Sequence, residues 1–274
     1  MLASKLPIGI FDSGIGGLTV VRQIRRVLPQ EDLIYLGDTA RVPYGTISPQ
    51  TVVRFACEDT QFLVERNVKA VVVACNTASA WALPTLQARF HLPIFGVIIP
   101  GVRAALTQTR NRRVGVIATP ATIRSQAYTK ELLARDDRIE LVARACPLLV
   151  PLVEEGRTTG PITEAVLRDY LAPILARNID TLVLGCTHYP LLKDAIQAVA
   201  GEGVTLVDSA QSCAEYVAEE LRPLGLLAPS RPRSGRIQPF VTDETGWFDG
   251  QAALFLGEPA EPSNAATLPS IELE

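Results

Sequence analysis

Short, continuous apolar runs alternate with longer helix-like segments along the whole chain. The runs lie at residues 8–12, 33–36, 69–74 and 94–97, and again at residues 114–118, 139–143, 181–184 and 205–208. Segments such as 18–28, 49–66 and 121–134 between them are expected to form helices. Strands that are apolar throughout and separated by helices indicate buried parallel sheets. The pattern therefore predicts an α/β fold.

The second half of the chain repeats the first. The stretch VVVACNTASA around Cys75 aligns with LVLGCTHYPL around Cys186, and the strands at 94–97 and 205–208 follow at the same offset. Any two apolar α/β segments look somewhat alike, but the shared order of strand, small residue, cysteine and polar residue favours a duplication. We therefore expect two similar parallel-sheet domains related by a pseudo-twofold, with an active site in the cleft between them.

The domain boundaries follow from this repeat. The first α/β domain is expected at residues 1–98 plus 208–256, and the second at residues 99–207. Residues 237–242 are predicted to form an edge strand. The Pro- and Ala-rich end at 257–274 is predicted to be a loose tail.

Composition narrows the possible partners. The formal net charge is -3, which gives no support for a nucleic-acid or anionic-membrane partner. The apolar stretch at 92–102 is too short for a membrane span of about 20 residues, and no signal peptide opens the chain. The five cysteines form no CxxC pair, which is typical of a reducing compartment. We expect a cytoplasmic protein.

Cys75 and Cys186 are the strongest candidates for chemistry. Each follows a predicted strand end, where ligands bind in open α/β sheets, and each precedes a helix whose N-terminus can lower a thiol pKa. A buried cysteine is often only a small hydrophobe, but two in matching positions could face a ligand from opposite sides, as an acid and a base. Cys57, Cys146 and Cys213 are weaker candidates.

Other polar motifs allow more than one interpretation. The turn from Asp12 to Gly17 resembles a phosphate-cradling loop, but Asp12 would oppose a phosphate, so we favour a proton or an ammonium there. The turn-rich segment 37–45 could reach the same cleft or be a surface turn, and the charged pair beginning at Glu154 is by default a solvated helix end. His188 could assist Cys186, bind a substrate or be structural.

Cofactor chemistry finds little support in the sequence. With only two histidines, the chain offers no closely spaced set of four metal ligands. Pyridoxal chemistry needs a lysine, and no lysine stands at a motif strand end. We therefore expect no cofactor.

Five motifs make the chain resemble the glutamate racemases of the aspartate/glutamate racemase superfamily. They are IGIFDSGIGGLTV, YLGDTARVPYG, VVVACNTASA, CPLLVPLVEEG and LVLGCTHYPLL, and they span residues 8–208. The resemblance implies interconversion of L- and D-glutamate without a cofactor, which supplies D-glutamate for peptidoglycan. It also implies a cytoplasmic enzyme that binds a small-molecule substrate and forms a homodimer.

The resemblance also implies residue roles. Cys75 and Cys186 match the acid/base pair, with Cys75 acting on D-glutamate and Cys186 on L-glutamate, and Asp12, Glu154 and His188 match supporting residues. The matched substrate contacts are Asp12, Ser13, Tyr44, Gly45, Asn76, Thr77, Thr119, Thr187 and His188. Three other functions are alternatives to a glutamate racemase. They are a racemase of aspartate or a hydantoin, a ligand-binding protein with a degenerate site, and a nucleotide-dependent enzyme.

Overall fold

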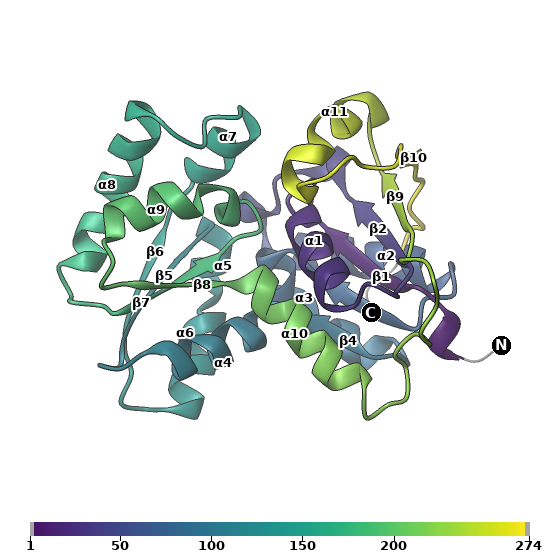
Figure 1. The fold of residues 1–274 in the computed structure, drawn as a ribbon, viewed down its shortest axis with the longest axis horizontal. Coiled ribbons are helices and arrows are strands. Elements are labelled where there is room, and N and C mark those ends of the chain that lie inside the picture. The colour runs from purple at the N-terminus through teal and green to yellow at the C-terminus, as the bar shows by residue number, and fades with distance from the viewer. Residues whose placement is uncertain (1–2, 272–274) are drawn as a thin grey trace.

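Two parallel sheets organise the molecule in the computed structural model, which describes residues 3–271 (Figure 1). The first sheet has the order β10-β9-β2-β1-β3-β4 and the second the order β6-β5-β7-β8. The first consists of β1 (Ile8–Asp12), β2 (Leu33–Gly37), β3 (Ala70–Val73), β4 (Ile94–Gly96), β9 (Ile237–Val241) and β10 (Asn264–Ala265). The second consists of β5 (Arg113–Ala118), β6 (Glu140–Ala145), β7 (Thr181–Gly185) and β8 (Thr205–Asp208). The strand pairs within each sheet are parallel.

The two sheets share one strand order. The run β2-β1-β3-β4 corresponds to β6-β5-β7-β8, so β3, which precedes Cys75, is the counterpart of β7, which precedes Cys186. The predicted fold of two similar α/β halves is thereby confirmed. The strands of the first sheet come from residues 8–96 and 237–265, and those of the second from residues 113–208. The proposed domain boundaries at 98 and 208 stay a prediction.

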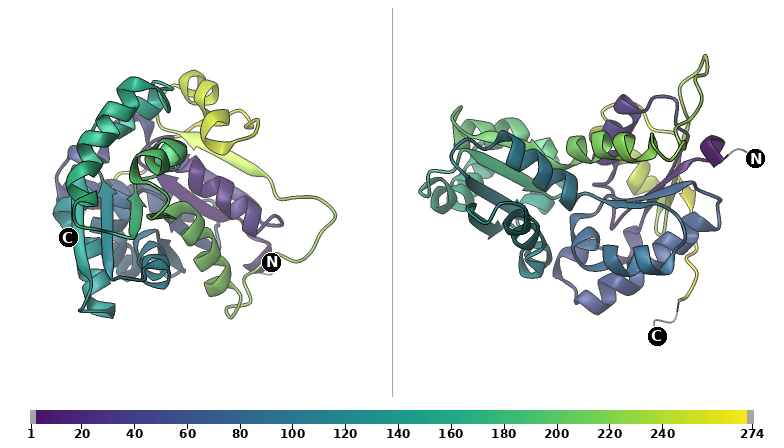
Figure 2. Two further views of the ribbon diagram at one scale, coloured as in Figure 1. Left: turned by 60° about the vertical axis from the view of Figure 1, so that its left-hand side comes forward. Right: turned by 90° about the horizontal axis from the view of Figure 1, so that it is seen from below.

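Helices cover the sheets and connect the two halves. They are α1 (Leu18–Val27), α2 (Pro49–Val64), α3 (Asn76–Arg89), α4 (Ile98–Gln108), α5 (Pro120–Ser125), α6 (Ala127–Arg135), α7 (Leu149–Glu154), α8 (Pro161–Leu175), α9 (Lys193–Ala200), α10 (Ser209–Leu221) and α11 (Thr245–Leu256). The chain passes between the sheets at the β4–α4 and β8–α10 connections, and α10 packs against both α1 and α4. Figure 2 shows the two halves side by side, joined by this green helical segment.

Matching glycines occupy matching places in the two central strands. A Cβ atom on Gly9 of β1 would lie 3.1 Å from side-chain atoms of Leu63 and Val68. On Gly115 of β5, a Cβ atom would lie 2.8 Å from both Ile174 and Ile179. Each glycine therefore lets hydrophobic side chains pack directly on the strand backbone.

The end of the chain is more ordered than the composition indicated. Strand β10 pairs with β9, so β9 is an interior strand rather than the predicted edge strand. Ala266, Leu268 and Ile271 pack against the hydrophobic core of the first half. Backbone pairing and apolar contacts thus hold parts of residues 257–271, and the assignment of 257–274 as a loose tail outside the two domains stays a prediction. Residues 272–274 lie outside the described part of the chain.

The helices bear on the question of a membrane span. Across residues 3–271, no helix is both long enough and apolar enough to cross a bilayer.

Gly115 provides a test of the packing in the second half. We predict that Gly115→Ala lowers the free energy of unfolding by about 1–3 kcal/mol, because the added methyl group overpacks the contact with Ile174 and Ile179. Gly203→Ala is the matched control, since a Cβ atom there has nothing within 4 Å. Urea denaturation measures both changes, and equal stabilities of the two variants would contradict the prediction.

Candidate functional site

A cavity of about 320 Å³ lies where the carboxyl ends of the two sheets meet. The segments that follow six strands, β1, β2 and β3 of the first sheet and β5, β6 and β7 of the second, supply its walls. The lining residues are Ser13, Gly14, Val42, Pro43, Tyr44, Gly45, Thr46, Cys75, Asn76, Thr77, Thr119, Pro120, Pro147, Val150, Pro151, Glu154, Cys186, Thr187 and His188. All the sequence-predicted site residues are among them except Asp12. Of the apolar members, Val42 and Pro43 lie in the segment 37–45 that was expected to be able to reach the cleft, whereas the sequence did not single out Pro120, Pro147, Val150 and Pro151 as site residues.

Cys75 is held at the start of α3 in the first half. Its Sγ accepts a hydrogen bond from the Ala78 N–H at 3.5 Å and lies 3.5 Å from Ser13 Oγ. Burial raises the pKa of the Cys75 thiol to about 12, and the nearby charge of Asp12 adds to this increase. The expectation that the helix N-terminus would lower this pKa is wrong, because loss of solvation outweighs the Ala78 hydrogen bond. Cys75 is therefore a thiol in the ligand-free protein at neutral pH.

Cys186 has a different electrical environment. His188 lies beside it, with Nε2 3.0 Å from Glu154 Oε1 and Nδ1 3.4 Å from Thr187 Oγ1. Burial lowers the pKa of His188, but the neighbouring Cys186 and Glu154 outweigh burial and raise it to about 10. At neutral pH, His188 therefore carries a positive charge next to the second cysteine.

Asp12 lies behind the cavity wall rather than in it. Its side chain is buried, its Oδ2 accepts the Gly14 N–H at 3.1 Å, and its Oδ1 has no partner among the described atoms. Burial raises the pKa of Asp12, whereas the charge of His188 lowers it. Asp12 acts electrostatically on Cys75, so it can influence proton transfer without contacting a ligand in this conformation.

The amide of Asn76 presents an unused donor. The Tyr128 hydroxyl donates to Asn76 Oδ1 at 2.7 Å, which fixes the orientation of the amide. The buried Nδ2 has no partner among the described atoms. An unpaired buried N–H is costly, so this donor is suited to bind an acceptor on a ligand in the cavity.

Three threonine hydroxyls connect the two halves at the cavity. Thr77 lies in the first turn of α3, whereas Thr119 and Thr122 belong to the β5–α5 region, and each pair of hydroxyl oxygens is 3.0 Å apart. Gly45 packs on this group, because a Cβ atom there would lie 2.9 Å from Thr119 Cβ. Thr122 was not predicted, since its only sequence signal is a hydroxyl one helical turn after Thr119.

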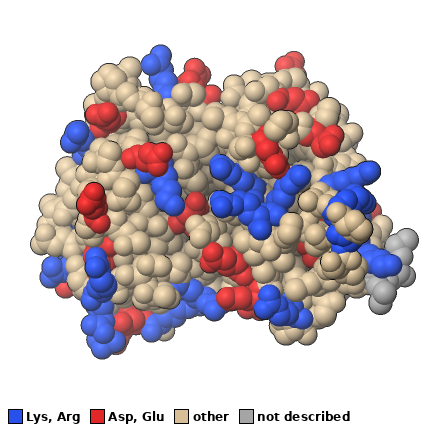
Figure 3. Space-filling view, in the orientation of Figure 1, with Lys and Arg blue, Asp and Glu red and all other residues tan. Residues whose placement is uncertain are grey.

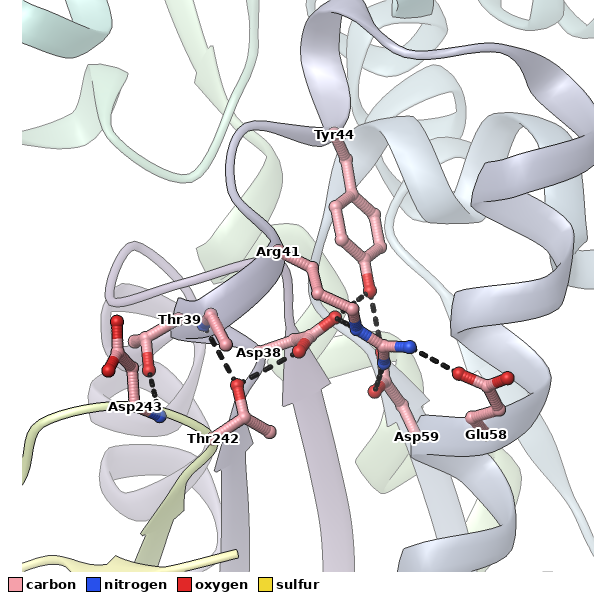
Figure 4. Close-up of polar contacts among 9 residues, drawn as sticks. Asp38, Thr39, Arg41, Tyr44, Glu58, Asp59, Thr242 and Asp243 are labelled. Atoms are coloured by element: carbon pink, nitrogen blue, oxygen red, sulfur yellow. Dashed lines mark hydrogen bonds and ion pairs between the residues drawn. The ribbon is translucent and has the colours of Figure 1, made fainter. Parts of the chain in front are cut away.

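Tyr44 lines the cavity, but its hydroxyl is not available there. The hydroxyl contacts Asp38 and lies 3.0 Å from Asp59 Oδ2, on the side of the loop that faces α2 (Figure 4). The predicted contact of Tyr44 with substrate would therefore be made by its ring or its backbone. Asp38, Arg41, Glu58 and Asp59, which surround this hydroxyl, were not predicted.

The described residues offer few positive charges or metal ligands at the cavity. Neither lysine nor arginine is among its described lining residues. Lys69 instead pairs with Glu31 and the Ser4 carbonyl at the opposite end of β3. Within residues 3–271, no group of three or more His, Cys, Asp and Glu side chains could hold a metal ion. On the face shown in Figure 3, basic and acidic side chains are interspersed, with one basic group near the middle.

His188 makes stability depend on pH. Its pKa of about 10 in the folded protein exceeds the ordinary value of 6.5, so its stabilising contribution is complete below pH 6.5 and is lost as the pH rises toward 10. We predict that the stability difference between wild type and His188→Asn shrinks by a few kcal/mol across this range. Urea denaturation at several pH values measures it, with the exposed His91→Asn as control. A constant difference for His188→Asn would contradict the prediction.

Comparisons with known proteins agree with this geometry. The family model described as Asp/Glu/Hydantoin racemase matches residues 14–217. A glutamate racemase of Geobacter metallireducens is 54% identical over 250 residues, which cover 91% of this chain and 92% of that protein.

Solved structures show the same likeness. The glutamate racemase of Thermus thermophilus in complex with β-chloro-D-alanine is 46% identical with a TM-score of 0.87, over 96% of this chain and 98% of that one. The glutamate racemase of Francisella tularensis in complex with D-glutamate is 37% identical with a TM-score of 0.89, over 96% and 98% of the two chains. The resemblance seen in the motifs is thereby confirmed: the chain belongs to the aspartate/glutamate/hydantoin racemase family.

Proposed function

We propose that this protein interconverts L- and D-glutamate, with Cys75 and Cys186 acting on opposite faces of the α-carbon. The observation that carries the proposal is the pair of cysteines at the ends of equivalent strands, β3 and β7, both lining one cavity. The names of the similar proteins support glutamate as the substrate. The cavity volume of about 320 Å³ suits a small amino acid.

In the direction from L- to D-glutamate, Cys186 acts first as the base. Its thiolate takes the α-proton, so the C–H bond breaks and an S–H bond forms. The Cys75 thiol then gives its proton to the opposite face of the carbanion and becomes a thiolate. This division is supported by the burial that keeps Cys75 protonated and by the positive charge of His188 beside Cys186, which would stabilise the proposed thiolate.

From D- to L-glutamate, the two cysteines exchange roles. Cys75 must then lose its proton, although burial raises its pKa to about 12. The ammonium group of the substrate brings a positive charge into the cavity, which favours the Cys75 thiolate and offsets the charge of Asp12. Asp12 thus supports proton transfer from outside the cavity lining, and Glu154 and His188 support it from the lining itself.

Neutral donors are proposed to bind the substrate carboxylates. The candidates at the cavity are Ser13, Asn76, Thr77, Thr119, Thr187 and the backbone around Gly45. Helix α3 begins at Asn76, and the N–H groups at its first turn favour an anion. His188 also lines this cavity and adds a positive charge next to Thr187.

The biological role follows from the proposed reaction. A cytoplasmic racemase of this kind supplies D-glutamate for peptidoglycan without a cofactor. A homodimeric state also stays a prediction.

A single assay tests the reaction and the substrate. Purified protein is incubated with each enantiomer of glutamate and of aspartate, without added cofactor, and the optical signal is followed by circular dichroism. Loss of the signal with both glutamate enantiomers supports the proposal. Turnover confined to aspartate, or activity that needs added pyridoxal phosphate or metal, would contradict it.

The two cysteines can be tested separately. We predict that Cys75→Ser and Cys186→Ser each lower racemisation by roughly 10³-fold or more, because a serine hydroxyl is a much weaker acid than a thiol. Elimination from β-chloroalanine needs only one deprotonation. Cys75→Ser should therefore still eliminate chloride from the L enantiomer, and Cys186→Ser from the D enantiomer.

Cys57→Ser is the control for this experiment, since Cys57 lies in α2 and is not among the residues that line the cavity. It should retain racemisation and eliminate from both enantiomers. Near-wild-type racemisation by either Cys75→Ser or Cys186→Ser would exclude the two-base mechanism.

A further inference from the structure

One wall of the cavity rests on a buried cluster of charged side chains. Five consecutive residues from Val42 to Thr46 line the cavity. On the opposite side of this segment lie three carboxyl groups, those of Asp38, Glu58 and Asp59, with exposed residue fractions of 0%, 8% and 0%. Figure 4 shows them around Arg41 and the Tyr44 hydroxyl, between the loop and helix α2. We call these five residues the carboxyl cluster.

The carboxyl cluster has more acidic groups than basic ones. Arg41 donates from Nε to Asp38 Oδ2 at 2.7 Å, from Nη2 to Asp59 Oδ1 at 3.1 Å, and from Nη1 to Glu58. Its guanidinium carbon also lies 3.9 Å from the centre of the Phe55 ring. One guanidinium cannot neutralise three ionised carboxylates, and an uncompensated buried charge is costly. The balance of charge therefore favours a proton retained within the cluster.

The contacts of Tyr44 locate this proton. Its hydroxyl has one hydrogen to donate, yet its oxygen contacts both Asp38 Oδ2 and Asp59 Oδ2. The hydroxyl can donate this hydrogen to only one of the two carboxylate oxygens. If both carboxyl groups were ionised, the other oxygen would face the phenol oxygen with no hydrogen between them. A proton on one carboxyl group resolves the conflict, because that group then donates to the phenol oxygen.

Both carboxylate oxygens of Asp38 accept hydrogen bonds from other donors than Tyr44, whereas only one oxygen of Asp59 does. Asp38 Oδ2 accepts from Arg41, and Asp38 Oδ1 accepts from the Thr242 hydroxyl at 3.0 Å. Asp59 Oδ1 accepts from Arg41, but within the described chain the one hydrogen-bond partner of Asp59 Oδ2 is the Tyr44 hydroxyl. The proton thus belongs on Asp59 Oδ2. Burial and the adjacent Asp38 also raise the pKa of Asp59 well above its usual range.

We propose that Asp59 is a positioning residue that keeps its proton at neutral pH, donates it to the Tyr44 hydroxyl, and thereby fixes the wall from Val42 to Thr46 around the substrate. This inference rests on the proposed function, because its kinetic readout is glutamate racemisation. Asp59 touches no substrate; it acts through Tyr44.

The link from Tyr44 to the cavity runs through the next residue. Gly45 packs against Thr119, whose hydroxyl bonds to Thr77 and Thr122. A shift of Tyr44 would therefore move Gly45 relative to the hydroxyls proposed to bind the substrate.

The first part of the loop is held independently. The Ala40 N–H donates to Thr242 Oγ1 at 2.9 Å, and the Asp243 N–H donates to Thr39 Oγ1 at 3.0 Å. Loss of the Asp59 proton should then disturb the wall rather than unfold the whole loop.

Replacement by asparagine distinguishes the two aspartates. In Asp59→Asn, the amide oxygen can accept from Arg41 and the amide nitrogen can donate to Tyr44, which reproduces the protonated acid. In Asp38→Asn, the amide nitrogen must face either the Arg41 guanidinium, which only donates, or the Thr242 hydroxyl, which then loses the acceptor of the hydrogen bond that it donates to Asp38 Oδ1. We expect Asp38→Asn and Asp59→Leu to raise KM for glutamate about tenfold or more, with a smaller change in kcat. Asp59→Asn should restore KM to within about twofold of wild type.

Glu65→Gln is the matched control, because it makes the same chemical change at the exposed end of α2. It should leave KM and kcat unchanged. An increase in KM for Asp59→Asn as large as that for Asp38→Asn would overturn the proposal. So would a KM for Asp59→Leu equal to that of wild type.

Infrared difference spectroscopy tests the proton without any substrate. At neutral pH, the carbonyl band of a protonated carboxylic acid should disappear in Asp59→Asn and persist in Glu65→Gln. If the band is unchanged in Asp59→Asn, the proposal is wrong. If wild type does not racemise glutamate, the proposed function fails, and the infrared result still decides whether Asp59 holds the proton.

Discussion

The position of the site depends on one property of parallel sheets: the carboxyl ends of all strands lie at the same edge. The two sheets share a strand order, and these edges meet at a common cavity. The counterparts β3 and β7 therefore bring Cys75 and Cys186 to the same space, although these residues are far apart along the chain. The other residues of the site determine the charge and the shape of the cavity around these two cysteines.

Similar backbones do not give the two cysteines similar chemistry. Cys75 is surrounded by groups that disfavour a second negative charge, since it is buried and acted on by Asp12. On the other side, Glu154 orients His188, and Cys186 and Glu154 together outweigh burial and raise the pKa of His188, which places a positive charge beside Cys186. The fold thus supplies a symmetric position for the sulfur atoms, and the neighbouring side chains give the two sulfur atoms unequal electrostatic surroundings. A two-base racemisation requires this inequality at each stage of turnover.

The cavity wall itself keeps most charges out of direct contact with the ligand. Its described lining contains many hydroxyls and prolines, while the guanidinium of Arg41 lies outside the lining and is bound by Asp38 and its neighbours. Amide and hydroxyl donors such as Asn76 and Thr119 can recognise carboxylates at fixed positions without long, flexible side chains. The charged groups behind the wall then act on its position and on the cysteines through short electrostatic contacts.

The sequence by itself determined the strands, their parallel arrangement and the cysteines at their ends, because continuous apolar runs and the residues after them are local signals. The tertiary structure decided those properties that depend on burial and on partners distant in the sequence. Burial outweighed the expected effect of the helix on the pKa of Cys75, the Tyr44 hydroxyl turned away from the cavity toward Asp59, and β10 paired with β9 where a loose tail was expected. The pKa of Cys75, the direction of the Tyr44 hydroxyl and the pairing of β10 with β9 depend on solvent exclusion and on atoms from other segments. The linear pattern of residues does not contain that information.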